Sequence, residues 1–207
     1  MRIITIKIGS SVLLTQRNKL DEFRIAHIAD QIQQLKGKGV GAVLVVSGAV
    51  ACGVSVLSFS TYDQKIRKMA AGIGQVMLIS VIERIFAAKG LRIAQMLLTR
   101  DLLESVSKGE EINQIIRHYL KMGIIPVINE NDVIDLNSFG GNDFLGARLT
   151  ILLGAKHFLV LSTLAGSSFG VGGGEAKMQA IDMVRQQDIQ ARIVDGKAKN
   201  ILLEVLS

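Results

Sequence analysis

The chain has 207 residues, 49% of them hydrophobic and 20% charged, which is enough for one domain with a buried core. Its apolar runs are short, and none reaches the roughly 18 consecutive apolar residues that indicate a membrane span. A single cysteine, Cys52, excludes an internal disulfide and a cysteine-rich metal site. The first residues read as a strand and not as a signal peptide, so we expect a soluble, cytoplasmic protein.

The net charge of +6 comes from 24 basic and 18 acidic residues. Such a surplus can indicate nucleic-acid binding, but the basic residues are scattered, and only two Tyr and seven Phe are present to stack bases. An anionic small molecule explains the charge equally well. The histidines also lack the spacing of metal ligands; they are His27, His118 and His157. We therefore expect no nucleic acid, no membrane and no protein-built metal site.

Apolar runs alternate with helical patterns along the whole chain. The predicted strands are residues 3–8, 42–46, 91–98, 124–128, 158–161 and 191–194. The predicted helices are residues 21–36, 65–89, 110–122, 143–153, 175–186 and 197–206. This alternation predicts an α/β fold in which a mostly parallel sheet is covered by helices on both faces, a three-layer α/β/α sandwich.

Glycine and proline mark the boundaries of these elements. Four glycines each precede a predicted strand by a residue or two, as glycine helix ends do; they are Gly39, Gly90, Gly123 and Gly154. Pro126 is the only proline and lies inside a predicted strand. Because proline cannot donate a ladder hydrogen bond, it predicts an edge or irregular position for that strand.

Polar or glycine-rich segments follow several predicted strands. They are residues 6–11, 46–49, 128–132, 141–143 and 170–177. Open α/β sheets bind ligands at the carboxyl ends of their strands, and glycine beside a helix start leaves backbone N–H groups available to anionic oxygens. Two lysines, two glycine loops and several carboxylates in these segments therefore indicate phosphoryl transfer.

The two lysines carry most of this interpretation. Phosphoryl transfer needs positive charge around the phosphoryl oxygens and a magnesium ion on the donor phosphates more than it needs a covalent nucleophile. Lys7 lies at the carboxyl end of the first predicted strand, and Lys177 lies in a first helical turn, where the helix dipole opposes a cation unless an anion is near. Each could instead be an ordinary solvated lysine. No Gly-x-x-x-x-Gly-Lys-Ser/Thr segment exists, which excludes a P-loop NTPase.

The remaining polar segments have a simple structural explanation as well as a functional one. Asn-Glu-Asn-Asp at residues 129–132 is either a solvated turn or part of a binding site. Asp143, behind Gly-Gly-Asn, is either a helix cap or a functional carboxylate. The glycine-rich residues 166–174 form either a flexible connector or a loop over phosphates.

In this order the segments resemble the amino acid kinase family, and within it the branch that phosphorylates the side-chain carboxylate of L-glutamate. The similar segments are Lys-Ile-Gly-Ser-Ser at 7–11, Val-Ser-Gly-Ala-Val-Ala-Cys-Gly at 46–53, Gly-Ile-Gly-Gln at 72–75, Gln-Met-Leu-Leu-Thr at 95–99, Pro-Val-Ile-Asn-Glu-Asn-Asp at 126–132 and the Gly-Gly to Lys-Met-Gln-Ala stretch at 173–180. The resemblance extends over nearly the whole chain.

The resemblance implies an enzyme that uses ATP and Mg²⁺ to convert L-glutamate to L-glutamyl 5-phosphate, the first step of proline biosynthesis. It also implies a homodimer or tetramer, and glutamyl phosphate reductase as a possible protein partner. Lys7 and Lys177 would stabilise the transferring phosphoryl group, and Asp143 would orient the lysines or the magnesium. Its implied substrate-binding residues are Ser47, Asp132 and Asn142. Its implied nucleotide-binding residues are Lys7, Gly9, Ser10, Thr163, Gly173 and Lys177, with Gly9, Ser10 and Gly48 supplying backbone donors.

The chain departs from the family pattern in its second half. Gly141 stands where an aspartate is usual, and Ser162-Thr163 stands where a Thr-Asp pair leads into the nucleotide site, so that Thr163 replaces its aspartate. The long excursion that normally follows is missing after Ser168. We therefore expect a single domain over 1–207 with a shortened nucleotide-binding lobe at about 155–207 and no further C-terminal domain. The alternatives are a catalytically impaired glutamate-binding protein and a sister kinase for another small acid.

Overall fold

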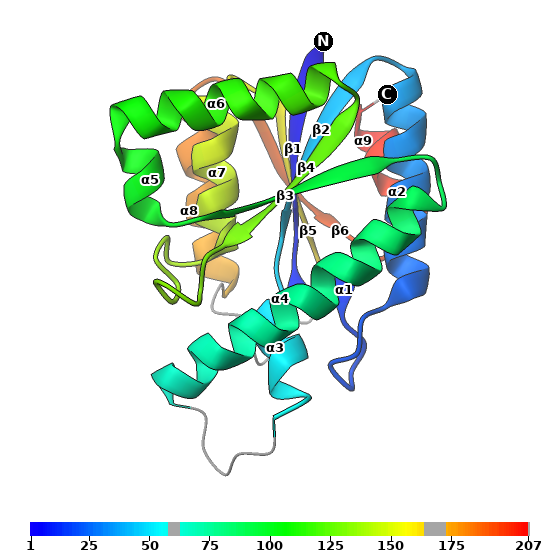
Figure 1. The fold of residues 1–207 in the computed structure, drawn as a ribbon. Helices are drawn as coiled ribbons and strands as arrows, with labels where there is room; N and C mark the ends of the chain where they lie inside the picture. Colours follow the sequence, from blue (N-terminus) through cyan, green and yellow to red (C-terminus); the bar gives the residue numbers. More distant parts are fainter. Residues whose placement is uncertain (58–62, 164–172, 207) are drawn as a thin grey trace.

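The computed structural model describes residues 1–57, 63–163 and 173–206, and its centre is a six-stranded sheet within these residues (Figure 1). The strands are β1 (Arg2–Ile8), β2 (Val40–Val46), β3 (Arg92–Leu98), β4 (Ile124–Glu130), β5 (His157–Ser162) and β6 (Gln190–Asp195). They lie in the order β3-β4-β2-β1-β5-β6, and every pairing is parallel. All carboxyl ends therefore meet at one edge of the sheet.

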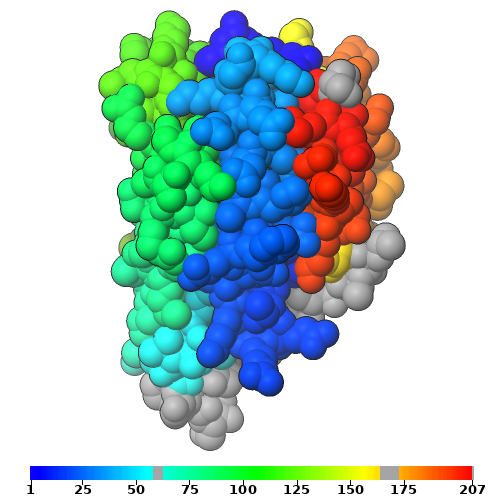
Figure 2. Space-filling model, turned by 90° about the vertical axis from the view of Figure 1, so that its right-hand side faces the viewer, coloured from blue at the N-terminus to red at the C-terminus, as the bar shows by residue number. Residues whose placement is uncertain are grey.

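Helices cover both faces, which confirms the predicted α/β/α sandwich. One face carries α2 (Glu22–Gly37), α4 (Gln64–Ala87) and α9 (Ile201–Leu206), with the short α1 (Ser10–Leu13) and α3 (Ala49–Val54) near the carboxyl edge. Viewed from this side, α2 lies between α4 and α9 (Figure 2). The other face carries α5 (Arg100–Glu104), α6 (Val106–Lys121), α7 (Asn142–Leu152) and α8 (Gly174–Arg185).

Burial of the sheet on both faces explains the near-continuous apolar runs of its strands. Along β1, Ile4, Ile6 and Ile8 pack into the core on the α2 side, whereas Ile3 belongs to the core on the α7 side. Since side chains alternate along a strand, Lys7 shares the face of Ile3. The sequence of β1 thus directs Lys7 toward α7, two residues before the chain leaves the sheet.

All six predicted strands and all six predicted helices are present, with boundaries shifted by a few residues. The predicted glycine ends are confirmed by left-handed φ angles of 75°, 69°, 68° and 55° at Gly39, Gly90, Gly123 and Gly154. The helix predicted from residue 197 begins only at Ile201, because Asp195 accepts a hydrogen bond from the Lys197 amide in a turn first. The short helices α1, α3 and α5 were not predicted, since four to six residues show no helical period.

Pro126 predicted an edge or irregular position, and the structure contradicts the edge. β4 lies between β3 and β2, so it is an inner strand. The β2 ladder pairs with β4 only at Val127 and Ile128, beginning one residue after the proline, whereas the β3 ladder runs along the whole of β4. The missing N–H of Pro126 is thus accommodated by a short ladder on one side of an inner strand.

Helix α4 is long and apolar enough, by length and composition, to cross a membrane. In the fold it is a partly buried helix of the core, where Leu78, Ile82, Ile85 and Phe86 pack with α2 and the sheet. This packing accounts for its apolar sequence, as expected for a helix of a soluble α/β domain.

Candidate active site

A cavity of about 430 Å³ opens where β1, β2, β4 and β5 end. Its lining includes every residue that the sequence predicts for the site: Lys7, Gly9, Ser10, Ser47, Asp132, Asn142, Asp143, Thr163, Gly173 and Lys177. They come from strand ends and helix starts scattered over the chain. The parallel topology brings them to one edge, as expected for a ligand site in an open α/β sheet.

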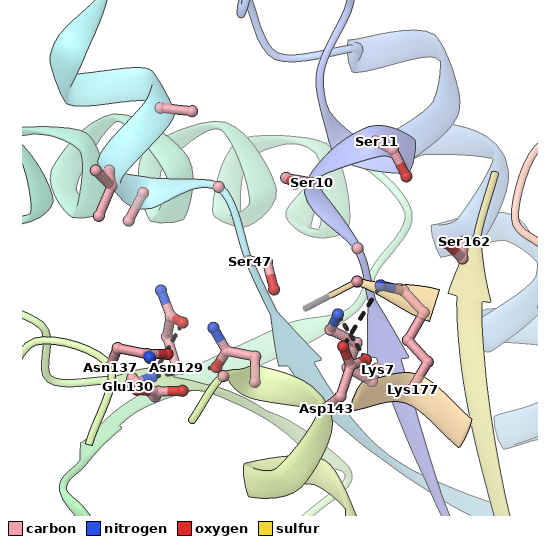
Figure 3. A pocket seen from close by; sticks show the side chains of 18 of the residues that line it. Lys7, Ser10, Ser11, Ser47, Asn129, Glu130, Asn137, Asp143, Ser162 and Lys177 are labelled. Carbon is pink, nitrogen blue, oxygen red and sulfur yellow. Dashed lines mark hydrogen bonds and ion pairs between the residues drawn. The ribbon is translucent and has the colours of Figure 1, made fainter. Parts of the chain in front are cut away.

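Two lysines share one buried carboxylate on one side of this cavity (Figure 3). Lys7 Nζ lies 2.8 Å from Asp143 Oδ1, and Lys177 Nζ lies 3.6 Å from Asp143 Oδ2. The side chains of Lys7 and Asp143 are only 6% and 2% exposed, and that of Lys177 is 17% exposed. Asp143 therefore holds two ammonium groups side by side, with a net positive charge directed at the cavity.

Burial lowers the pKa of Lys7, because removing an ammonium from water disfavours its charged form. The ion pair with Asp143 acts in the opposite direction, and the neighbouring charge of Lys177 lowers the pKa further. An anion between the two lysines would relieve their repulsion. The pair is therefore suited to bind phosphoryl oxygens.

The turn after β1 differs from expectation at Gly9. Its amide donates to the Leu161 carbonyl at 3.0 Å, so the backbone donor expected at Gly9 is already used inside the protein. Gly9 instead allows close approach, since an added Cβ would lie 3.2 Å from that carbonyl oxygen. Nearby, the Ser11 hydroxyl accepts from the Thr163 amide at 3.4 Å and joins the ends of β1 and β5.

Ser47 and Gly48 are held by close packing of α3 on α4. Gly48 precedes α3 with a φ of 107°, which only glycine adopts without strain. A Cβ added at Gly53 would lie 1.8 Å from the Ala70 carbonyl oxygen, and a Cβ added at Gly74 would lie 1.7 Å from the Ala49 carbonyl oxygen. These glycines explain two of the motif segments: they let α3 seat against α4 and fix the turn that carries Ser47.

The wall opposite the lysines is polar and internally bonded. Asn129 donates to Gln75 Oε1 at 2.8 Å, which gives the last residue of the Gly-Ile-Gly-Gln segment a structural role. Asn142 Oδ1 accepts from the Glu130 amide at 3.3 Å, which ties the start of α7 to the end of β4. Asp132 Oδ1 accepts from the Asn137 amide at 2.9 Å.

Asp132 lies within electrostatic reach of a guanidinium that the sequence did not identify, that of Arg67. Burial raises the pKa of Asp132, while its bond from Asn137 and the charge of Arg67 lower it. Arg67 belongs to α4 and lines the same cavity. The sequence offered no signal for Arg67, because it lies in a helix with other basic residues and its approach depends on how α4 packs.

Glu130 also lines the cavity, and the sequence predicted no role for it, although it belongs to the quoted Asn-Glu-Asn-Asp segment. Of the glycine-rich segment 166–174, only Gly173 and Gly174 fall within the described residues, and both line the cavity. The rest of the predicted phosphate loop and the stretch that follows Thr163 lie outside the described residues.

The described part of the chain contains no group of three or more His, Cys, Asp or Glu side chains that could hold a metal ion. Both oxygens of Asp143 already face ammonium groups. The described residues therefore offer no preformed cage of oxygen ligands for a magnesium ion.

Comparison with known proteins agrees with this geometry. The sequence profile of the amino acid kinase family matches residues 2–166. Glutamate 5-kinase of Vibrio vulnificus is 32% identical, in an alignment covering 100% of this chain and 64% of the relative. Glutamate 5-kinase of Clostridium acetobutylicum is 29% identical, covering 99% and 90%. The chain thus spans just under two thirds of the length of the Vibrio protein.

Solved structures share the fold at low sequence identity. UMP kinase from Ureaplasma parvum superposes with a TM-score of 0.68 at 13% identity, over 100% of this chain and 95% of that one. An isopentenyl phosphate kinase superposes with a TM-score of 0.67 at 15% identity, over 99% and 95%. These structures support the architecture and leave the acceptor open.

Proposed function

The chain belongs to the amino acid kinase family, and from this premise we propose that it transfers the γ-phosphoryl group of MgATP to the side-chain carboxylate of L-glutamate. The products are ADP and L-glutamyl 5-phosphate. The observation that carries the proposal is the buried cluster of Lys7, Asp143 and Lys177, which faces a polar wall across one cavity.

The chemistry suits this arrangement. A carboxylate oxygen of the acceptor attacks the γ-phosphorus, and the bond from that phosphorus to the β,γ-bridging oxygen breaks, leaving its electrons on ADP. The nucleophile is already ionised, so no general base has to remove a proton. The enzyme's task is positioning and neutralisation of charge on the transferring group. Lys7 and Lys177 supply that charge, and Asp143 keeps them together.

On the donor side, Lys7, Lys177, Ser10, Thr163 and Gly173 would hold the phosphates. The magnesium ion that comes with ATP would neutralise charge on those phosphates. We further propose that the nucleotide lobe is shortened. The alignment with the Vibrio relative runs over 243 positions although this chain has 207 residues, so the relative carries segments that this chain lacks.

On the acceptor side, the cavity offers the charges that a free amino acid needs. Asp132 provides a carboxylate for an ammonium group, and Arg67 provides a guanidinium for a carboxylate close to it. Ser47 and Asn142 add neutral polar contacts. An amino acid zwitterion fits this pair of opposite charges better than a nucleotide or a prenyl phosphate does, and this supports glutamate within the family.

A second candidate is a catalytically impaired protein that still binds glutamate. It is favoured by Gly141 and Thr163, each of which stands where the family pattern has an aspartate. A sister kinase for another small acid is the third. The expected cytoplasmic location, a role in proline biosynthesis and a partnership with glutamyl phosphate reductase depend on the glutamate assignment and are proposed with it.

Assembly as a homodimer or tetramer is also part of the proposal. Three apolar side chains on α4 are exposed in the single chain: Met69 at 48%, Ile73 at 37% and Val76 at 65%. Such side chains on one helix beside the sheet are suited to contact a second copy. Sedimentation of the purified protein would show the assembly directly.

Replacing Asp132 with asparagine tests the acceptor site. We expect L-glutamate affinity, measured by calorimetry, to fall by about ten- to a hundredfold, because a charged hydrogen bond worth roughly 1.5 to 3 kcal/mol is lost. Affinity for MgATP should stay within about twofold of the wild type. Asp101→Asn, at an exposed carboxylate of α5 outside the cavity lining, is the matched control and should leave both affinities nearly unchanged.

The same calorimetry with L-aspartate, UMP and isopentenyl phosphate tests the choice of acceptor. The proposal expects L-glutamate to bind most tightly to the wild type. Equal glutamate affinity in Asp132→Asn would remove Asp132 from the site. Tighter binding of another compound would transfer the assignment to a sister kinase.

A further inference from the structure

Glu130 is a buried carboxylate that the proposed reaction does not use. It is the last residue of β4, is 3% exposed, and lines the active-site cavity. Both of its carboxylate oxygens are among the buried atoms of the described residues that have no hydrogen-bond partner of ordinary geometry. A buried polar group in that condition is costly, so its presence calls for a physical reason.

The carboxylate lies against the turn that leads into α7. The backbone amides of Phe139 and Gly141 act on it and favour its ionised form. Gly141 is the residue before α7 and has a φ of 118°, and Gly140 has a φ of 81°. The turn is therefore built from unusual backbone angles, and it directly precedes Asn142 and Asp143.

Two acidic residues hold the two ends of this turn. Asp132 accepts from the amide of Asn137, which also has a positive φ, at 59°. Glu130 faces the amides of Phe139 and Gly141 at the far end. In addition, the Glu130 amide donates to Oδ1 of Asn142, the first residue of α7. Glu130 therefore contacts the start of α7 through its backbone and the preceding turn through its side chain.

The charges around Glu130 leave it close to a change of state at neutral pH. Burial raises the pKa of Glu130 to about 7, the neighbouring Asp132 and Asp135 raise it too, and the two amides lower it. On the β1 side Lys7 is near enough for Glu130 to raise the pKa of the lysine, which is paired to Asp143 of α7. From α4, Arg67 faces Asp132.

We propose that Glu130 is a positioning residue: its ionised carboxylate draws the Phe139 and Gly141 amides inward and so sets Asn142 and Asp143 at the start of α7, and its protonation releases that turn. The effect on the acceptor rests on the proposed function, whereas the effect on the turn does not. As the pH falls through about 7, Glu130 takes up a proton, the attraction to the amides weakens, and acceptor affinity decreases.

The sign of the effect on folding is opposite. The pKa of Glu130 is raised in the folded protein, so protonation of this carboxylate stabilises the fold. This contribution is complete when the pH lies below the range in which glutamate ordinarily titrates, and it is lost as the pH rises through about 7. The ionised form that positions the site is thus the less stable one. Such a conflict between local stability and site geometry is typical of functional carboxylates.

Amide chemical shifts measured by heteronuclear NMR between about pH 5 and pH 9 test the proposal in the ligand-free protein. In the wild type, the Phe139 and Gly141 amides should shift with a common midpoint near 7. In Glu130→Gln, which keeps the shape and removes the titration, that midpoint should vanish. Asp135→Asn is the control: it should keep the transition and move it to lower pH, because the Asp135 charge raises the pKa of Glu130.

Absence of a common transition in the wild type, or its persistence in Glu130→Gln, would overturn the proposal. L-Glutamate affinity gives the second readout: in the wild type it should fall by about tenfold for each pH unit below the midpoint, and in Glu130→Gln it should be weak and flat over that range. If L-glutamate binds neither protein at any pH, the proposed function fails, and the amide shifts still decide the role of Glu130.

Discussion

Replacement of Lys7 or Lys177 with alanine is expected to lower the turnover rate by on the order of 10²-fold or more, with little effect on the fold. Both ammonium groups would act on charge that develops in the transition state, so their loss should appear in kcat more than in KM. Lys7 is buried, so Lys7→Met, which keeps the aliphatic stem and removes the charge, is the sharper variant.

Steady-state ADP release and circular dichroism on the same preparations would make this measurement. Lys156→Ala is the matched control, because Lys156 is exposed and precedes β5 at the opposite edge of the sheet. The control should turn over at the wild-type rate. Turnover near the wild-type rate in both Lys7→Met and Lys177→Ala, with the fold intact, would contradict the assignment of these lysines.

The second large effect concerns the nucleotide. If the lobe after Thr163 is shortened, contacts to adenine and ribose are lost while the phosphate contacts of Lys7, Lys177 and Gly173 remain. Each lost hydrogen bond costs roughly 0.5 to 1.5 kcal/mol, so several together weaken ATP binding by on the order of a hundredfold. We therefore expect magnesium tripolyphosphate to bind nearly as tightly as MgATP.

Calorimetric titration of ATP, ADP and tripolyphosphate in the presence of Mg²⁺ would measure this. Lys177→Ala should weaken ATP and tripolyphosphate by similar factors, because its charge acts on phosphates in both ligands. ATP binding far more tightly than tripolyphosphate would show that the chain has a base pocket after all, and the proposed shortening of the lobe would be wrong.

Most of the fold could be predicted because a sheet buried on both faces imposes its pattern directly on the sequence. The six strands are short apolar runs, separated along the chain by longer helical segments. Positive φ angles at Gly39 and Gly123 bear out the glycine signals. The short helices α1 and α3 could not be predicted in this way, and the inner position of Pro126 depends on strand order, which local sequence does not encode.

The candidate site could be predicted where its residues lie at or just after the carboxyl ends of strands, because a parallel sheet collects those positions at one edge. This explains why Lys7, Ser47 and Asp132 line one cavity. The sequence did not predict those roles that depend on tertiary packing. Arg67 reaches the cavity through the packing of α4, and the amide of Gly9 is occupied by a carbonyl on β5, which only pairing of the strands reveals.

Trapping of the product tests the central claim most directly. Wild-type protein incubated with L-glutamate, MgATP and hydroxylamine should form γ-glutamyl hydroxamate, the compound that an acyl phosphate gives with hydroxylamine, in a one-to-one ratio with ADP. Lys7→Met should form neither above background. ADP release without hydroxamate would show that glutamate is not the acceptor, and absence of both products from a folded, glutamate-binding wild-type protein would contradict catalysis altogether.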